Sequence, residues 1–225
     1  MQYRKDRLEK DYYYHAYSRS ISKYIIFNDD SDYLRMLDII KLYRFCDFNH
    51  SYSKFLELDL NTQEEIIKNL ESSSPVLVEI IAYCLMPTHL HLILKQITDH
   101  GISKYMSNIL NCYSRYFNIN HQRTGPLWAG RFKSVLVDKD EQMLHLTRYF
   151  HLNATSAGLV KKPEDWQFSS YKEYIDKVDI SEKICSYNNL FDISPKEYRK
   201  FVLDRKDYQQ QLSKIKSILI DDYTG

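Results

Sequence analysis

The sequence predicts an α+β fold: a ferredoxin-like antiparallel sheet with helices on one face, plus a helical C-terminal tail. Segments with the two-residue period of strands and segments with the helical period follow one another in the order β-α-β-β-α-β-α, which is typical of such a sheet with one added helix. Beyond residue 175 the sequence becomes polar, with a helix start at residues 194–197 and a helical apolar stripe over residues 212–219. We therefore expect a main domain over residues 1–175 and an accessory tail over residues 176–225.

The N-terminal part of the chain predicts a strand, a helix and a helical insertion. Residues 12–20 are aromatic and polar in partial alternation, as expected of a strand with one exposed face. Residues 31–43 carry apolar side chains at helical spacing behind candidate N-cap residues. Residues 61–70 predict a shorter helix, closed by turn-forming residues, that has the character of an insertion.

Two apolar segments predict the buried centre of the sheet. Residues 76–85 are dense in Val, Ile and Leu, the chain breaks at Met86-Pro87, and residues 89–95 continue as a second strand. Residues 102–117 then place apolar side chains on one face of a long helix. The two strands are expected to be adjacent and tightly joined.

The last strand and helix of the main domain follow a polar loop. Residues 131–137 alternate as a strand. Asp138 with Glu141 resembles a capping box for a third helix that reaches about Asn153, and Gly158 supplies a stop signal.

The charge balance and the apolar pattern exclude some classes of protein. The 225 residues include 31 basic and 30 acidic side chains, so a nucleic-acid site must be a local patch rather than a general positive field. The most apolar stretch, Val76–Met86, is interrupted by Glu79, and the N-terminus lacks the apolar segment of a secretory signal. The four cysteines stand far apart without a CxxC pair. We expect a cytoplasmic protein with reduced thiols and no contact with a membrane.

Tyrosine is unusually abundant, with 20 residues. Aromatic side chains can stack on unpaired bases. However, Tyr, Lys, Asn and Ile are all abundant here and all have AT-rich codons, so genome composition explains most of the excess. Base stacking needs aromatic side chains at particular positions.

His89 and His91 are the first candidates for chemistry. They flank Leu90 on a predicted strand, so their side chains leave the same face and one metal ion could accept both. The alternative is that one of these imidazoles only satisfies a backbone carbonyl.

Tyr149 and Asn153 are the second pair of candidates. They lie one turn apart on the same face of the predicted third helix, so Tyr149 could face a metal that Asn153 ligates. A tyrosine among apolar neighbours is, taken alone, more typical of a core aromatic residue. His145 lies one turn before Tyr149 and has the same two interpretations.

Four blocks of the sequence, taken in order, resemble the motifs of the single-tyrosine HUH transposases, and within them the REP-associated tyrosine transposases related to small insertion sequences. The resemblance covers about residues 12–174. The blocks are AYCLMPTHLHL (82–92), GRFK (130–133), RYFHLN (148–153) with AGLV (157–160), and Trp166 with SSY (169–171). The sequence departs from the usual pattern at Thr88, where Asn is common, and at Ala154-Thr155, where Pro-Val is common.

The resemblance implies a role for four matched residues. His89 and His91 would be the metal ligands, Asn153 the third ligand, and Tyr149 the nucleophile that forms a 5′-phosphotyrosine intermediate and leaves a free 3′-hydroxyl. The donor set suits Mg²⁺ or Mn²⁺ as the divalent metal, although imidazole ligands alone would favour later transition metals. No nucleotide cofactor is expected, and the chain has no GxxxxGK[ST] signature. Single-stranded or hairpin DNA is the expected substrate.

Contacts to DNA are expected from the loop over residues 121–133. It combines phosphate-binding charge with a stacking surface in Arg123, Trp128, Arg131 and Lys133. Trp128 has core packing as its alternative role. Arg148 on the third helix is a further candidate, as are Lys104 and Arg115, although a solvated helix face explains each equally well. Trp166 and Tyr171 are interpreted as packing residues.

Three other functions compete with a DNA-cleaving and rejoining enzyme. The chain could be a domesticated protein that binds a DNA hairpin in a cellular role without transposing, and an intact active site does not separate the two. A metal-dependent RNA-processing nuclease is disfavoured because no RNA-binding motif is present. An unrelated His-x-His metalloprotein does not explain four ordered blocks. The sequence leaves open the DNA target and whether the protein is a monomer or a homodimer.

Overall fold

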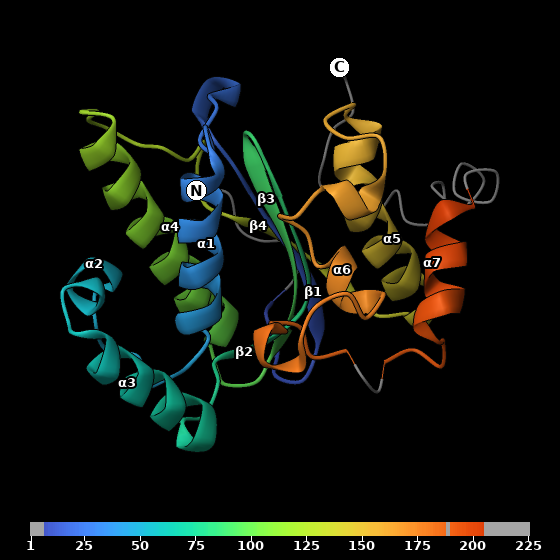
Figure 1. Cartoon of the computed structure of the whole chain (residues 1–225), viewed down its shortest axis with the longest axis horizontal. Coiled ribbons are helices and arrows are strands. Elements are labelled where there is room, and N and C mark those ends of the chain that lie inside the picture. The colour runs from blue at the N-terminus through green and yellow to red at the C-terminus, as the bar shows by residue number, and fades with distance from the viewer. Residues whose placement is uncertain (1–6, 188–189, 205–225) are drawn as a thin grey trace.

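Four antiparallel strands form one sheet in the order β2-β3-β1-β4, so that β1 and β3 are the central strands. This is a computed structural model, and it describes residues 7–187 and 190–204 (Figure 1). The strands are β1 (Tyr13–Arg19), β2 (Val78–Met86), β3 (His89–Gln96) and β4 (Lys133–Val137). The α-helices are α1 (Asp30–Leu42), α2 (Tyr52–Leu56), α3 (Leu60–Ser73), α4 (Gly101–Asn120), α5 (Asp140–Ser156), α6 (Tyr171–Tyr174) and α7 (Pro195–Leu203). Short 3-10 turns are η1 (Ile21–Lys23), η2 (Pro163–Asp165) and η3 (Ile180–Glu182).

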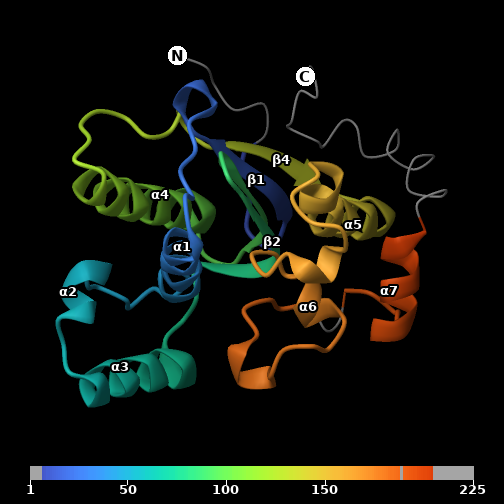
Figure 2. The same cartoon turned by 45° about the horizontal axis from the view of Figure 1, so that its top comes forward.

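Helices cover both faces of this sheet. Helices α1 and α4 lie on one face, and α5, with α6 and α7, lies on the other (Figures 1 and 2). The pair α2 and α3 lies outside α1, as expected of an insertion. The predicted α+β class and its antiparallel sheet are confirmed, and the two helices that connect the strands share a face as predicted. The added helix α5 occupies the opposite face, which creates a second apolar layer.

Strand β1 is buried on both faces, so the expected exposed face is a wrong prediction. Residues 14–18 are all buried. Tyr14 and Ala16 belong to the apolar core below α1 and α4, whereas His15 and Tyr17 alternate with them and therefore point to the face that α5 covers. The polar aromatic side chains of His15 and Tyr17 favour a solvent-exposed face in the sequence. In the structure they are buried on the face that α5 covers.

The tight connection between β2 and β3 fixes where β3 begins. Pro87 and Thr88 form the turn, and Met86 pairs with His89. The backbone of Ser20 donates to the Thr88 carbonyl at 2.8 Å, and Ile26 donates to the Pro87 carbonyl at 2.8 Å. The end of β1 therefore holds this turn, and with it the start of β3, in place.

The helix ends agree with the sequence in two places and differ in one. The predicted capping box at Asp138 is wrong, because the backbone stays extended through Lys139, which becomes the N-cap without a side-chain hydrogen bond. Gly158 adopts a positive φ of 73° just after α5, as its stop role requires. Ser194 and Glu197 form a reciprocal capping box at α7. The apolar stripe expected over residues 212–219 lies outside the described residues.

None of the four cysteines, which all lie in the described part of the chain, forms a disulfide bond. Within residues 7–187 and 190–204, no helix combines the length and the apolar character needed to cross a membrane.

Candidate active site

The two histidines of the His-x-His pair lie side by side on the face of β3 that α5 covers. Their ring centroids are 4.9 Å apart and their planes are nearly perpendicular, at 88°. His91 is fully buried, whereas His89, next to the β2–β3 turn, is half-buried. The shared face follows from the two-residue period of a strand, and the difference in burial follows from their distance to the end of that strand.

Tyr149 approaches this pair from α5. Its ring centroid lies 6.0 Å from that of His91, with the two planes at 86°. Only 2% of Tyr149 is exposed. Asn153, one helical turn further along, is also buried, and its Nδ2 makes no hydrogen bond to any described residue. The structure thus brings Tyr149 to His91, and it leaves Asn153 buried on the same helix face.

Two residues of β1, which sequence reasoning missed, complete the surroundings of the pair. The Nε2 atom of His15 lies 3.0 Å from Nδ1 of His91, within hydrogen-bond distance. The ring of Tyr17 lies 4.8 Å from that of His91 and 5.7 Å from that of His89, measured between centroids. In the sequence, His15 and Tyr17 form a His-x-Tyr pattern with the same two-residue period as His89 and His91. The pattern alone does not predict that these residues meet the histidine pair, because this depends on the pairing of β1 with β3.

Cationic side chains continue the same rows across the sheet. Arg19 is the Cα partner of His89, and Lys133 is the Cα partner of Tyr17, which in turn pairs with His91. Residues directly opposite each other on antiparallel strands have side chains on the same face. Arg19 and Lys133 are both exposed, and within the described residues neither makes an ion pair or a side-chain hydrogen bond. The histidine pair therefore has two available cations beside it.

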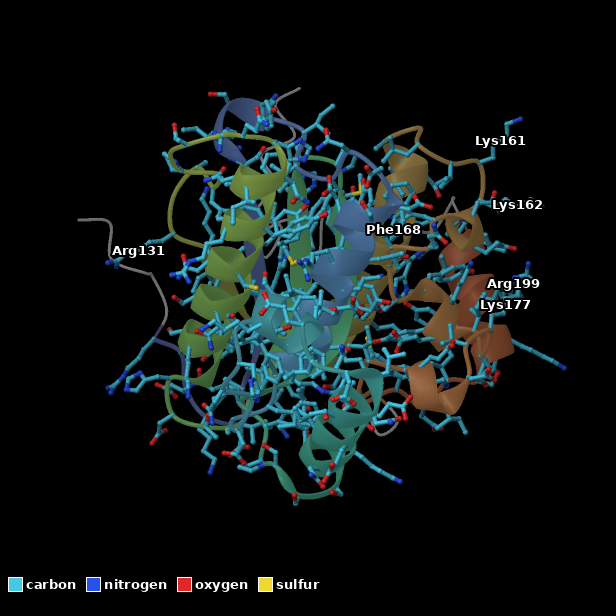
Figure 3. All side chains as sticks on the ribbon, turned by 60° about the vertical axis from the view of Figure 1, so that its left-hand side comes forward. Arg131, Lys161, Lys162, Phe168, Lys177 and Arg199 are labelled. Carbon is cyan, nitrogen blue, oxygen red and sulfur yellow. The ribbon has the colours of Figure 1, made fainter. Side chains whose placement is uncertain are left out.

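The loop between α4 and β4 is fastened to the same end of β1. Ala129 donates to the Arg19 carbonyl, and Ile21 donates to the Leu127 carbonyl, both at 2.9 Å. Arg131, two residues after Ala129, is exposed. In the view of Figure 3 it projects from the side of the molecule opposite to Lys161, Lys162, Lys177 and Arg199. Because Ala129 is hydrogen-bonded to Arg19, which pairs with His89, the loop places the exposed Arg131 near the start of β3.

Two other residues of this loop have structural contacts. Arg123 donates to the side chain of Asn118 at 3.1 Å and to the Pro126 carbonyl at 2.9 Å, so it braces the loop. The indole of Trp128 donates to the Leu110 carbonyl at 3.0 Å and packs against the core. Trp128 is half-buried, so one part of its side chain packs in the core, and its contact with DNA stays a prediction.

Arg148 is fully buried, so the expectation that it contacts DNA does not fit this structure. Its guanidinium donates to the Asp204 carbonyl and lies 4.4 Å from the ring centroid of Phe201 on α7. His145 also faces Phe201, at 5.4 Å between ring centroids. Residues of α5 on this side contact the C-terminal segment rather than the histidine pair.

A second buried histidine on α5, His151, also contacts the C-terminal segment. His151 lies 2.7 Å from the Tyr198 hydroxyl and 2.9 Å from the Ser170 hydroxyl. Burial lowers the pKa of His151 to about 3, so its ring is neutral at physiological pH. His151 therefore connects α5 to α7 and to the segment before α6, without a charge to offer a substrate.

Tyr113 and Tyr116 on α4, the other tyrosines weighed as nucleophiles, are on the opposite face of the sheet. Tyr113 belongs to the core below α1 and α4, and its hydroxyl donates to the Ile26 carbonyl. Tyr116 donates to Asp32 at 3.0 Å, and burial raises the pKa of its phenol. Neither phenol is near His89 and His91.

The donor groups beside Tyr149 fit a divalent metal. Within the described residues, no group of three or more His, Cys, Asp or Glu side chains is arranged to hold an ion. The expected set needs only two imidazoles, because its third member, Asn153, is an amide. Nδ1 of His89 lies 3.0 Å from the Thr88 hydroxyl and Nδ1 of His91 lies 3.0 Å from His15, so both rings have the supporting contacts that metal-binding histidines require.

The comparisons with known proteins agree with this fold. Residues 52–153 match the family described as "Transposase IS200 like", a segment that contains His89, His91, Tyr149 and Asn153. Over that segment the chain is similar to the IS200-like transposases. His15, Tyr17 and Arg19 precede the matched segment.

The chain is also similar to one curated protein and to one solved structure, both described as REP-associated tyrosine transposases. A candidate REP-associated tyrosine transposase of Haemophilus influenzae is 27% identical over 104 residues, which are 41% of this chain and 58% of that protein. The chain thus spans little more than half the length of that relative. The structure of a REP-associated tyrosine transposase bound to a REP hairpin superposes with a TM-score of 0.51 at 15% identity, covering 87% of this chain and 96% of that one. This second likeness establishes the fold.

Proposed function

We propose that this protein is a metal-dependent tyrosine transposase that cleaves and rejoins single-stranded DNA with Tyr149 as its nucleophile. The observation that carries the proposal is the approach of Tyr149 to the histidine pair, 6.0 Å from His91 between ring centroids. Their spacing in the chain gives no reason for a helix tyrosine and a strand histidine to meet. A transposase of the matched family needs them together.

The cleavage step needs no external energy source, because one O–P bond forms as another breaks. The Tyr149 oxygen attacks the scissile phosphorus, an O–P bond forms, and the bond from phosphorus to the 3′-oxygen of the upstream nucleotide breaks. The phenol loses its proton and the departing 3′-oxygen gains one, which leaves a 5′-phosphotyrosine and a free 3′-hydroxyl. Attack by a 3′-hydroxyl on the phosphotyrosine reverses these changes and rejoins a strand.

The residues that would hold the metal are His89 and His91 through Nε2, and Asn153 through its amide oxygen. Two nitrogens, one oxygen and water suit Mn²⁺, and Mg²⁺ with more water. A divalent ion there would polarise a non-bridging phosphate oxygen and offset its charge. A free phenol has a pKa near 10, so a nearby positive charge favours its ionised, nucleophilic form.

The surface beside the pair favours a nucleic-acid backbone as the substrate. Arg19, Lys133 and Arg131 are exposed cations near the end of β3 where His89 lies. Together they could contact phosphates on either side of the scissile bond. A REP hairpin is the DNA bound in the structure of similar fold. We therefore propose a hairpin with an adjoining single strand as the substrate, since an unpaired phosphate can reach a recessed tyrosine.

One observation favours the alternative, a protein that binds a DNA hairpin in a cellular role and does not cut it. With 2% of Tyr149 exposed, the nucleophile is covered in this conformation. A cleaving enzyme has to uncover the phenol when DNA binds, whereas a binding protein does not.

Covalent capture separates the two functions. The full chain is incubated with Mn²⁺ and a panel of labelled hairpins with single-stranded flanks, and the products are resolved under denaturing conditions. The proposed function predicts an adduct that survives denaturation and a peptide carrying DNA at Tyr149 by mass spectrometry. Binding to hairpins in a gel-shift assay with no adduct across the panel would favour the binding protein instead.

A further inference from the structure

Each histidine of the pair is held by a hydrogen bond at the same ring nitrogen. Nδ1 of His91 lies 3.0 Å from Nε2 of His15, and both side chains have no exposed surface. Nδ1 of His89 lies 3.0 Å from Oγ1 of Thr88. The two partners come from different elements, since His15 is in the middle of β1 and Thr88 is in the β2–β3 turn.

We propose that His15 and Thr88 are positioning residues, which fix the rotation and the tautomer of His91 and His89 so that both present Nε2 to the metal. The proposal rests on the proposed function and names residues that support its metal site. An imidazole can bind a metal through only one nitrogen, and a hydrogen bond at the other nitrogen decides which one. With Nδ1 committed in both rings, Nε2 is the ligand atom in both.

The proton positions follow from this assignment. His91 carries its proton on Nδ1 and donates it to Nε2 of His15, so His15 carries its own proton on Nδ1. His89 likewise donates from Nδ1 to the Thr88 hydroxyl oxygen. His15 is therefore an acceptor for His91 and not a third metal ligand. This agrees with the absence, in the described part of the chain, of any three His, Cys, Asp or Glu side chains arranged around an ion.

Packing of aromatic rings around His15 and His91 makes the hydrogen bond between them difficult to replace. The ring of Phe150 lies 5.1 Å from that of His15 and 5.3 Å from that of His91, between centroids. Tyr17 covers His91 from β1 at 4.8 Å. No water replaces a lost acceptor easily in such surroundings, so a His91 ring without His15 would have to turn or change tautomer to satisfy its Nδ1 proton.

Matched substitutions separate an acceptor from a mere space-filling group. His15→Gln keeps an acceptor close to the position of Nε2, and His15→Leu removes it at similar volume. Thr88→Ser keeps the hydroxyl, and Thr88→Val removes it with the same shape. Mn²⁺ affinity of the full-length proteins is measured in the absence of DNA from the electron paramagnetic resonance signal of free Mn²⁺, and folding is checked by circular dichroism.

We expect His15→Leu and Thr88→Val each to weaken Mn²⁺ binding by about 10- to 100-fold, the usual range for removing such a supporting contact. His15→Gln and Thr88→Ser should stay within a few-fold of the wild type. Should His15→Leu fail to fold, the His15→Gln variant and the Thr88 pair still decide the result.

Two results would overturn this inference and leave the proposed function intact. One is wild-type affinity in folded His15→Leu and Thr88→Val. The other is a folded His15→Gln variant that binds Mn²⁺ at least about 10-fold more weakly than the wild type, because a residue that cannot be replaced by another acceptor acts in a different way. A folded wild type that binds no Mn²⁺ would instead overturn the metal site of the proposed function, and this inference with it.

Discussion

The ring of Tyr149 stands edge-on to the ring of His91, with centroids 6.0 Å apart and planes at 86°. Tyr17 contacts the same imidazole from β1, with ring centroids 4.8 Å apart. Two phenols therefore flank one histidine. The one on α5 is the nucleophile we propose, and the one on β1 is the rival that the structure introduces.

Tyr149→Phe should abolish the covalent adduct with hairpin DNA, whereas Tyr17→Phe should retain it. Each change removes one oxygen and keeps the ring, so folding should survive in both. The adduct is measured on denaturing gels with labelled DNA and Mn²⁺. Loss of the adduct in Tyr17→Phe alone would transfer the role of nucleophile to β1.

Removing one imidazole of the pair should remove the metal. We expect His91→Ala to lower Mn²⁺ affinity by at least about 100-fold, since a direct ligand matters more than a supporting residue. His50→Ala is a matched control, because His50 is exposed and lies between α1 and α2, on the side of the sheet away from α5. Isothermal titration with Mn²⁺ gives the affinities. Equal binding by the wild type and the folded His91→Ala variant would place any metal elsewhere.

Arg19→Ala should weaken hairpin binding and reduce its dependence on salt. Arg19 lies beside His89 and makes no ion pair in the described structure, so its charge is available to a phosphate. Loss of one phosphate contact lowers the slope of log affinity against log salt concentration by about 0.7 to 0.9. Fluorescence anisotropy at several salt concentrations measures it. Lys68→Ala, which removes an exposed cation on α3, should leave the slope unchanged, and identical slopes for all three proteins would refute a role for Arg19.

Tyr198→Phe should destabilise the fold without changing the chemistry of folded molecules. The Tyr198 hydroxyl contacts His151 at 2.7 Å and Thr147 at 3.0 Å, and it fastens α7 to α5 in a buried position. Losing it should cost about 1–2 kcal/mol. For a chain of this size the melting temperature falls by about 2–4 °C per kcal/mol. A variant that keeps the wild-type melting temperature but loses the adduct would instead give Tyr198 a part in the reaction.

Glu173→Gln should stabilise the fold more at pH 8 than at pH 5. Burial raises the pKa of Glu173 above its ordinary value near 4.5, although the backbone amides of Ile184 and Cys185 donate to it. The folded state therefore binds the proton more tightly, and its stabilising effect is lost as the pH rises through the folded-state pKa. Glutamine keeps an acceptor without a charge.

Thermal melts of the wild type and Glu173→Gln at pH 5 and pH 8 test this sign. The titration of His151 is common to both proteins and cancels in the difference. A gap between the two melting temperatures that is larger at pH 5 would contradict the expected direction.

The order of the elements and the spacing of Tyr149, Asn153, His89 and His91 could be predicted because they depend on local periodicity. A two-residue period puts neighbours i and i+2 on one strand face, and a four-residue step puts Tyr149 and Asn153 on one helix face, whatever the rest of the chain does. The four blocks of the resemblance added the expectation that these two faces meet.

The tertiary structure alone decided which residues surround the pair. His15 and His91 are 76 residues apart and form a hydrogen bond only because β1 lies between β3 and β4. Arg148 has the sequence character of a surface cation, but Phe201 and the Asp204 carbonyl enclose it. Strand pairing and helix docking are set by burial of apolar surface summed over the whole chain, so no local pattern of residues encodes them.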